Sequence, residues 1–415
     1  MMFLYTRVHS DLGAVPKNVK SLIFGLFVYC IAWGILDPFL AIFFHQVMGN
    51  YSLAGLLYGL FFLIGAGLSI PVGDLADKVN RIKFIAFSIL AYPLIGLLYF
   101  ASVFAGAFSL AAVFVARLLH GVGALFWIMS AGFIRENSPK EETSAMFGLY
   151  ISVCRFAYVI APLFSIPIIL FLGLSTTSIN WLFLVLIPFP IISAILLFRI
   201  KDKGMPFPAA INEVVVKDGV VKKELQDLRE MGFAGTFVIL LGFFIKAIEA
   251  IILFLIPLYM ASLNLDLVHI AIIFSIINIP YLLSFFFAEL ADSWGKINVI
   301  SLGFLLTAFA LTAIAFIPVT SSAFYVACFA LGVILALIRP AVNGLITDIT
   351  PRVNEGEITG LFTTVLKIGG FVSALSLGIL SDFFGLSFPF LLFAALLLVM
   401  SAVTYSIKRK IVVKI

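Results

Sequence analysis

The sequence has few charged residues for its length. Only 11% of its 415 residues are Asp, Glu, Lys or Arg, while 63% are hydrophobic. A soluble domain carries about 25% charged residues, so this composition cannot cover a water-exposed surface. The shortage of charge excludes a soluble globular protein and predicts an integral membrane protein that lies almost entirely within the lipid bilayer.

Cysteine and histidine are also scarce. The three cysteines, Cys30, Cys154 and Cys328, fall inside apolar runs at a spacing that matches no metal site. We expect them to be small buried side chains. The four histidines are scattered and offer neither a nucleophile–base pair nor a metal cluster, and no P-loop occurs. These absences argue against an enzyme, a bound metal or cofactor, and ATP-driven pumping.

Twelve apolar runs are long enough to cross a membrane as helices, which takes roughly 20 residues each. The stretch before the first run, Met1 to Lys20, is not expected to be a cleavable signal. The runs cover residues 21–44, 51–72, 84–105, 108–133, 143–171, 178–199, 233–261, 267–290, 297–318, 322–346, 357–381 and 387–407. The pattern predicts an all-α membrane protein with twelve transmembrane helices.

The basic residues sort to one side of the predicted membrane. With both termini inside, 21 of the 26 Lys and Arg residues lie in the tails and inner loops, five lie within spans, and none lies in an outer loop. Cytoplasmic loops carry the excess of Lys and Arg in membrane proteins. The distribution therefore predicts a multi-pass plasma-membrane protein with both termini in the cytoplasm, and it gives the basic charge a role that needs no nucleic acid.

One long polar stretch divides the chain into six plus six spans. We expect a first bundle at residues 1–199, a cytoplasmic linker at 200–232 and a second bundle at 233–415. Within the linker, residues 214–221 could form a hairpin and residues 222–231 a surface helix. The alternative is a mobile linker throughout.

The two sets of spans repeat each other in sequence. Three pairs of motifs match at an offset of 212 residues and a fourth at 215. The pairs are Ser138-Pro139 with Thr350-Pro351, Gly148-Leu149 with Gly360-Leu361, Arg155 with Lys367, and Leu75-Ala76-Asp77 with Leu290-Ala291-Asp292. Because each repeat has six spans, both halves enter the membrane in the same direction. We expect two six-helix bundles related by a pseudo-two-fold axis normal to the membrane, with any binding site between them.

The charged turn after the second span resembles the signature of the major facilitator superfamily. Its residues Gly73-x-Leu-Ala-Asp77-x-x-x-Arg81-x-Lys are similar to the family's Gly-x-Leu-Ala-Asp-Arg-x-Gly-Arg-Arg/Lys. The resemblance implies that Gly73 allows close helix approach, and that Asp77 and Arg81 latch the cytoplasmic side while the outside is open. Asn80 replaces a family glycine, and both residues tolerate a left-handed backbone. The alternative is an ordinary charged turn.

A weaker copy of this turn, residues 288–296, adds Asp292 and Lys296 to the implied latch. In the fourth span, Arg117-Leu-Leu-His120-Gly-Val-Gly resembles the family's Arg-x-x-Gln-Gly-x-Gly, whose arginine is associated with proton coupling or substrate charge. His120 stands in place of the glutamine. It is either a proton site, since histidine titrates near neutral pH, or a hydrogen-bonded packing residue.

Two shorter patterns concern the type of transport. Residues 157–162 are weakly similar to an antiporter signature of the fifth helix, of which only Pro162 and small-residue spacing remain. Trp33-Gly34 followed by Asp37-Pro38-Phe39-Leu40 resembles the first helix of drug-exporter-like members. The resemblance thus implies a drug-exporter-like transporter and favours exchange.

Seven charged side chains fall well inside the spans, where each costs about 2.5–3.5 kcal/mol to insert. We expect them to face a wet cavity or to pair, although one or two could be structural ion pairs. They are Asp37, Arg117, Arg155, Lys246, Glu249, Arg339 and Lys367. Five basic and two acidic groups give a formal excess of +3. That sign favours a substrate with a carboxylate or phosphate.

Positions within the spans suggest how these charges are used. Asp37 and Arg117 both lie in the outer halves of their spans, so we expect a pair in which Asp37 is the proton site and Arg117 its switchable partner. Lys246 and Glu249 are three residues apart on one helix and should pair directly. The candidates for proton coupling are Asp37, Arg117, Glu249 and His120, and those for the substrate cavity are Arg155, Lys246, Arg339 and Lys367. Arg155 and Lys367 share a repeat position, so we expect them to face each other across the central axis.

These features together predict a secondary active transporter that works by alternating access as a monomer. The expected partners are lipid, protons and a small organic solute, anionic or amphipathic rather than cationic. Proton antiport and efflux are favoured. Two alternatives stay open: an organic-anion symporter or facilitator, and a non-transporting membrane receptor or scaffold on the same fold.

Overall fold

A computed structural model describes residues 15–76, 78–139, 143–205, 232–349 and 355–412 of the chain. Within these ranges almost every residue is helical. Eleven helices are long and apolar enough to cross a membrane, and a twelfth crossing results if the bent pair Leu267–Leu283 and Phe286–Trp294 counts as one span. The predicted twelve-helix membrane architecture is confirmed.

Each crossing is one long helix or a succession of two or three shorter helical segments. The first half comprises α2 (Lys17–Met48), α3 (Tyr51–Ala76), α4 (Arg81–Leu90), α5 (Tyr92–Ser102), η1 (Gly106–Phe108), α6 (Ser109–Gly123), α7 (Phe126–Asn137), α8 (Thr143–Leu172), η2 (Thr176–Leu186) and α9 (Pro188–Phe198). The second half comprises α12 (Gly232–Ala250), η3 (Ile251–Leu255), α13 (Ile256–Ser262), α14 (Leu267–Asn278), η4 (Ile279–Leu283), α15 (Ser284–Trp294), α16 (Lys296–Phe316), α17 (Ser322–Ile349), α18 (Glu355–Phe384) and α19 (Ser387–Val412). Prolines mark some of the breaks: Pro188 lies in the first turn of α9, and Pro280 in that of η4. Proline supplies no backbone N–H for the preceding turn.

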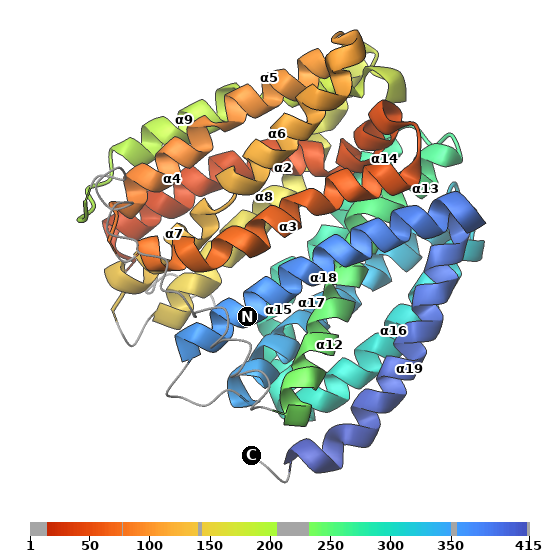
Figure 1. The fold of residues 1–415 in the computed structure, drawn as a ribbon. Coiled ribbons are helices and arrows are strands. Elements are labelled where there is room, and N and C mark those ends of the chain that lie inside the picture. The colour runs from red at the N-terminus through yellow and green to blue at the C-terminus, as the bar shows by residue number, and fades with distance from the viewer. Residues whose placement is uncertain (1–14, 77, 140–142, 206–231, 350–354, 413–415) are drawn as a thin grey trace, which may run out of the picture.

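The two halves form two bundles that lie against each other (Figure 1). Their longest contacts run between α3 and α18 and between α8 and α14. The sequence repeat is carried into the helices, because α8 and α18 each contain 30 residues and both ends lie 212 positions apart. The contact of α3 with α18 therefore corresponds to that of the second crossing of the other half, α14, with α8. Of the matching motifs, Thr350-Pro351 lies outside the described residues.

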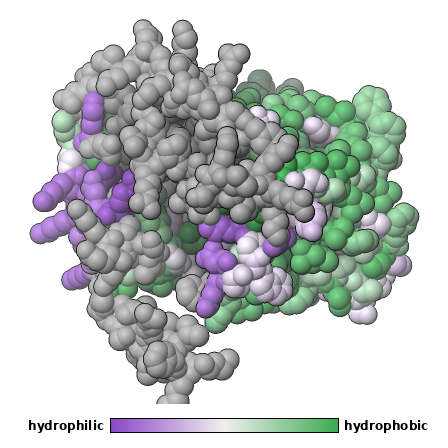
Figure 2. All heavy atoms as spheres, turned by 90° about the horizontal axis from the view of Figure 1, so that it is seen from below, coloured by the Kyte–Doolittle hydropathy of each residue, from purple (hydrophilic) through white to green (hydrophobic). Residues whose placement is uncertain are grey.

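The surface outside the bundles is apolar, as a lipid environment requires. Large side chains such as Phe171, Phe316 and Phe383 are exposed, whereas α2 is buried along most of its length. Figure 2 shows hydrophobic residues over the right-hand side of one face and hydrophilic ones at its left edge and below its centre.

The charged turn between α3 and α4 differs from expectation in two ways. Asn80 has φ −66° and ψ 100° and caps α4, with its side chain accepting the Lys83 N–H at 2.9 Å. Capping the next helix, rather than a left-handed backbone, thus accounts for Asn80. A Cβ atom added to Gly73 would meet nothing within 4 Å, so among the described residues no helix approaches closely there in this conformation. Asp77 lies outside the described residues.

The start of the predicted linker is fixed to this turn. The Asn80 N–H donates to the Met205 carbonyl at 2.9 Å, and the Met205 N–H donates to the Lys78 carbonyl at 3.0 Å. The Asn80 side chain also donates to the Asp202 carbonyl at 2.8 Å. Residues 200–205 therefore pack onto the first bundle. The predicted hairpin at 214–221 and helix at 222–231 lie outside the described residues.

Candidate functional site

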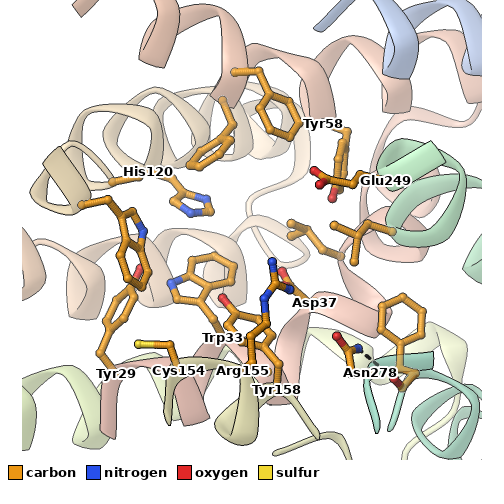
Figure 3. A pocket seen from close by; sticks show the side chains of 18 of the residues that line it. Tyr29, Trp33, Asp37, Tyr58, His120, Cys154, Arg155, Tyr158, Glu249 and Asn278 are labelled. Atoms are coloured by element: carbon orange, nitrogen blue, oxygen red, sulfur yellow. Dashed lines mark hydrogen bonds between the residues drawn. The ribbon is translucent and has the colours of Figure 1, made fainter. Parts of the chain in front are cut away.

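A cavity of about 410 Å³ lies between the two bundles (Figure 3). Its walls come from α2, α3, α6, α7 and α8 of the first half and from α12, η3, α14 and α17 of the second. Six of the seven predicted intramembrane charges line it, namely Asp37, Arg117, Arg155, Lys246, Glu249 and Arg339, together with His120. Lys367 lies elsewhere. Four basic and two acidic side chains give the wall a formal charge of +2, the sign that the sequence predicts.

Arg117 is held by backbone carbonyls and by His120. It is 2% exposed, and its guanidinium donates to the carbonyls of Leu57, at 2.9 Å, and of Tyr58. Three aromatic rings lie within 5.3 Å of the guanidinium carbon. In the described part of the chain, no ion pair of 4.0 Å or less joins Arg117 to Asp37, so the predicted pair is absent from this conformation. The carbonyls of α3 supply the acceptors that Asp37 was expected to provide.

His120 acts here as a packing residue. Its Nδ1 atom lies 2.9 Å from the Arg117 guanidinium, and its ring stacks on Trp33 with centroids 4.1 Å apart. Arginine can only donate hydrogen bonds, so Nδ1 accepts and carries no proton. In this conformation the geometry favours the packing alternative over a proton site.

Replacing Arg117 by alanine should destabilise the first bundle. The change removes charge-assisted hydrogen bonds to α3 and the contacts of the guanidinium with three aromatic rings, at a cost of about 2–4 kcal/mol. Unfolding in mixed detergent micelles should occur at a clearly lower denaturant concentration. Arg135→Ala, on the exposed face of α7, is the control and should leave the midpoint in place. An unchanged midpoint for Arg117→Ala would contradict a structural role.

Glu249 joins two cations of the second bundle. The Lys246 Nζ atom lies 2.6 Å from Glu249 Oε2, which confirms the predicted pair. Arg339 of α17 adds an ion pair at Oε1, without the alignment of a hydrogen bond. Each carboxylate oxygen of Glu249 thus has a cation beside it, so the negative charge of Glu249 is balanced by residues of its own half.

Arg155 and Asp37, unlike Lys246, Glu249 and Arg339, have no charged partner close by in the described part of the chain. Neither makes an ion pair of 4.0 Å or less with any described residue. The guanidinium of Arg155 lies 4.9 Å from the centroid of the Tyr281 ring, which is 5.7 Å from the guanidinium of Arg339. In Figure 3, Arg155 and Asp37 reach into the space that Glu249 faces from the second bundle. Sequence reasoning missed Tyr281, because one more aromatic side chain in a chain with 12 Tyr and 45 Phe gives no signal.

Lys367 and Arg155 do not face each other. The ammonium of Lys367 donates to the Gly65 carbonyl at 3.0 Å and to Ser69 Oγ at 2.6 Å, both on α3. Each residue thus reaches into the opposite half, Lys367 at the α18–α3 contact and Arg155 towards Tyr281. The expectation of a direct encounter is wrong because the pseudo-two-fold axis places these equivalent residues at two separate bundle contacts.

The basic residues of the implied latch pair within their own halves. Arg81 is 5% exposed and forms an ion pair with Glu136 of α7, while Lys296 Nζ lies 3.6 Å from Asp292. Both basic side chains lie over glycines 212 positions apart: a Cβ at position 132 would lie 2.9 Å from Arg81 Nε, and one at 344 would lie 2.8 Å from Lys296 Cε. The repeat therefore extends to side-chain packing. A latch between the halves remains a prediction.

One end of the bundle contact is closed. A Cβ added to Gly55 of α3 would lie 2.4 Å from the Ala374 carbonyl, and one added to Gly378 of α18 would lie 2.3 Å from the Tyr51 carbonyl. Further along α3 the contact is made through a side chain, since Lys367 of α18 reaches Gly65 and Ser69. The two backbones therefore touch at the end that bears no basic loops, and in Figure 1 the helices separate towards the end that bears them.

Asp382 adds a polar tie at the closed end. From the end of α18 it accepts the N–H groups of Tyr51, at 2.9 Å, and Ser52, at 2.7 Å, as well as the Ser52 hydroxyl. Asn50 accepts the Leu53 N–H at 2.8 Å. The first N–H groups of a helix have no partner within the helix, so the second bundle completes the start of a helix of the first. No pattern in the sequence indicates a role for Asp382.

Known proteins resemble this chain along nearly its whole length. The sequence profile described as Major Facilitator Superfamily matches residues 22–373 and 279–411. An uncharacterized transporter of that type from Methanocaldococcus jannaschii is 25% identical over 401 residues, covering 95% of this chain and 99% of the relative. The staphylopine export protein of Staphylococcus aureus is 23% identical over 411 residues, covering 95% and 96%.

A solved structure shares the fold. The crystal structure of a POT family transporter in complex with 5-aminolevulinic acid matches with a TM-score of 0.73 at 13% identity, over 95% of this chain and 97% of that one. Such an identity supports the fold alone. Together with the matched profile and the paired bundles around a charged cavity, it shows that this chain belongs to the Major Facilitator Superfamily of transporters.

Proposed function

We propose that this chain is a secondary active transporter that moves a small organic solute with an anionic group by alternating access. The observation that carries the proposal is the cavity, which both bundles line with an excess of positive charge. Groups of one charge in a cavity attract solutes of the opposite charge. Its volume of about 410 Å³ suits a small-molecule site, since such sites span roughly 300–1,000 Å³.

The bundles at residues 1–199 and 233–415, joined by the linker at 200–232, are the moving bodies in this proposal. If the basic loops face the cytoplasm of a plasma membrane, with both termini on that side, the close contact at Gly55 and Gly378 seals the outside. The described conformation is then inward-facing. The outer surface of the paired bundles is apolar and suits contact with lipid, which is consistent with a monomer.

The proposal also includes proton coupling, and Asp37 is the residue that we expect to bind and release the proton. A carboxylate in a membrane interior that exchanges a proton for a cationic partner would link protonation to conformation. Asp37 faces the cavity without an ion-pair partner among the described residues, so it is open to such a change. The export function of the staphylococcal relative supports efflux, and proton antiport is the way of driving this efflux that we propose. An organic-anion symporter or facilitator is the second candidate.

The proposal is tested with the purified chain in lipid vesicles. An outward-directed proton gradient, with the vesicle interior acidic, should drive accumulation of a labelled organic anion by antiport, and an ionophore that collapses the gradient should abolish it. Accumulation driven by an inward-directed gradient would instead indicate the symporter. A facilitator would equilibrate the anion without accumulation. A receptor or scaffold on this fold would show no flux at all, which would contradict the proposal.

Breaking the tie at Asp382 should loosen the closed end. Asp382→Ala removes three hydrogen bonds between the bundles, and a lost helix cap costs about 0.5–2 kcal/mol. A cysteine at Ala374, which is fully buried in the contact, should then react several-fold faster with a membrane-impermeant maleimide. Asp266→Ala is the matched control, because Asp266 caps α14 within its own half. Equal labelling of both variants would show that Asp382 does not hold the bundles together.

A further inference from the structure

Two arginines from opposite bundles share one aromatic ring. The guanidinium carbons of Arg155, on α8, and Arg339, on α17, lie 4.9 and 5.7 Å from the centroid of Tyr281. Because both carbons are measured from the same ring centre, they cannot be further apart than the sum of the two distances. Both arginines also line the cavity, so one small solute bound there is near both side chains.

The ring stands at a break in its crossing. Tyr281 belongs to the 3-10 turn η4, directly after Pro280. This turn ends at Leu283, just before the point where the two parts of the crossing bend by 62°. It is 9% exposed, so its position is set by the surrounding packing. Guanidinium groups stack favourably on aromatic faces, and Tyr281 therefore gives each arginine a fixed support.

The charges around the ring are incompletely balanced. Glu249 pairs with Arg339 and Lys246, which leaves this cluster with one positive charge in excess. Arg155 has no ion pair of 4.0 Å or less with any described residue, and Asp37 is not that close to it. Two cations near one ring repel each other, and an anion that contacts both guanidinium groups would offset this repulsion. Each guanidinium has five N–H donors, enough to bind an added anion besides existing partners.

We propose that Arg155 and Arg339, spaced by Tyr281, form a clamp for one anionic group of the substrate, a carboxylate or a phosphate. The bound group would be held by both bundles at once and would favour their approach around it. Tyr281 is then a positioning residue that acts through the two arginines. This inference deepens the proposed function, since it assigns the part of the cavity that recognises the anionic group.

Binding of three matched probes to the purified full chain tests the clamp. The probes are 3-phenylpropionate, phenylphosphonate and 3-phenylpropanamide, which carry a carboxylate, a phosphonate and a neutral amide. At least one of the two anions should raise the thermal unfolding midpoint and the amide should not; which anion is stronger tells carboxylate from phosphate recognition. Arg155→Gln should weaken binding of that anion about tenfold or more, as expected for a lost charge-assisted contact.

The variants at Tyr281 separate positioning from general packing. Tyr281→Phe keeps the ring and should bind the anion nearly as the wild type does, whereas Tyr281→Leu should bind it about tenfold more weakly. Tyr405→Leu, which alters an exposed ring of α19, is the matched control. Unchanged anion binding by Tyr281→Leu or Arg155→Gln, equal binding of the amide, or no binding of either anion would overturn the clamp. The assay needs no gradient, so a loss of gradient-driven transport with anion binding intact would refute the proposed function alone.

Discussion

Replacing Gly55 by leucine is expected to abolish transport while leaving both bundles folded. Even a Cβ at this position would lie 2.4 Å from the Ala374 carbonyl, so a leucine cannot fit while α3 and α18 touch. Overpacking of this kind costs about 1–3 kcal/mol or more, and 2.7 kcal/mol corresponds to about a 100-fold change in an equilibrium. The closed end should open, and the transport rate in vesicles should fall about 100-fold.

Gly67→Leu is the matched control on the same helix. A Cβ at Gly67 meets nothing within 4 Å, so this variant should transport at close to the wild-type rate. Both proteins should elute as single species of the same size from a gel-filtration column. Wild-type transport by Gly55→Leu would mean that α3 and α18 need not touch during the cycle, and that the closed end has no functional part.

Asp37→Asn is expected to separate transport from the proton gradient. The amide has nearly the shape of the acid but cannot bind and release a proton at neutral pH. If Asp37 is the coupling group, a pH gradient should no longer drive accumulation of the substrate anion, while exchange of labelled for unlabelled substrate continues. The rate of that exchange should also lose its dependence on pH. Parallel assays of driven uptake and exchange in the same vesicles measure both effects.

Glu289→Gln serves as the control for Asp37→Asn. This carboxylate is exposed on α15 and does not line the cavity, so driven uptake should persist after its replacement. Undiminished driven uptake by Asp37→Asn would reject Asp37 as the proton site. Since Glu249 is the other cavity carboxylate, Glu249→Gln would then be the next variant to test.

The architecture could be predicted from the sequence because a helix that crosses a lipid bilayer requires a recognisable sequence pattern. Membrane crossings need long apolar runs, and the repeat offset between Arg155 and Lys367 recurs in the ends of α8 and α18. The break in the crossing that contains Tyr281 could not be located with equal certainty. Proline occurs both at breaks, as at Pro280, and inside continuous helices, as at Pro38 in α2.

The composition of the site was predictable to a larger extent than its geometry. Charged residues are costly in a membrane, so Asp37 and Arg155 stood out against an apolar background. Their partners depend on how helices rotate and approach, which sequence spacing fixes only within one helix, as for Lys246 and Glu249. For this reason the sequence did not indicate that Arg117 binds carbonyls of α3.

Distances between spin labels on the two bundles test the central claim most directly. The three native cysteines are buried, so added cysteines can be labelled selectively. One pair, at Arg135 and Trp294, reports on the end with the basic loops, and another, at Val103 and Phe316, reports on the opposite end. We predict that the first pair is far apart when the second is close, and that Gly55→Leu reverses the two. A single set of distances, unchanged by Gly55→Leu at either end, would contradict transport by rocking of the bundles around the shared cavity.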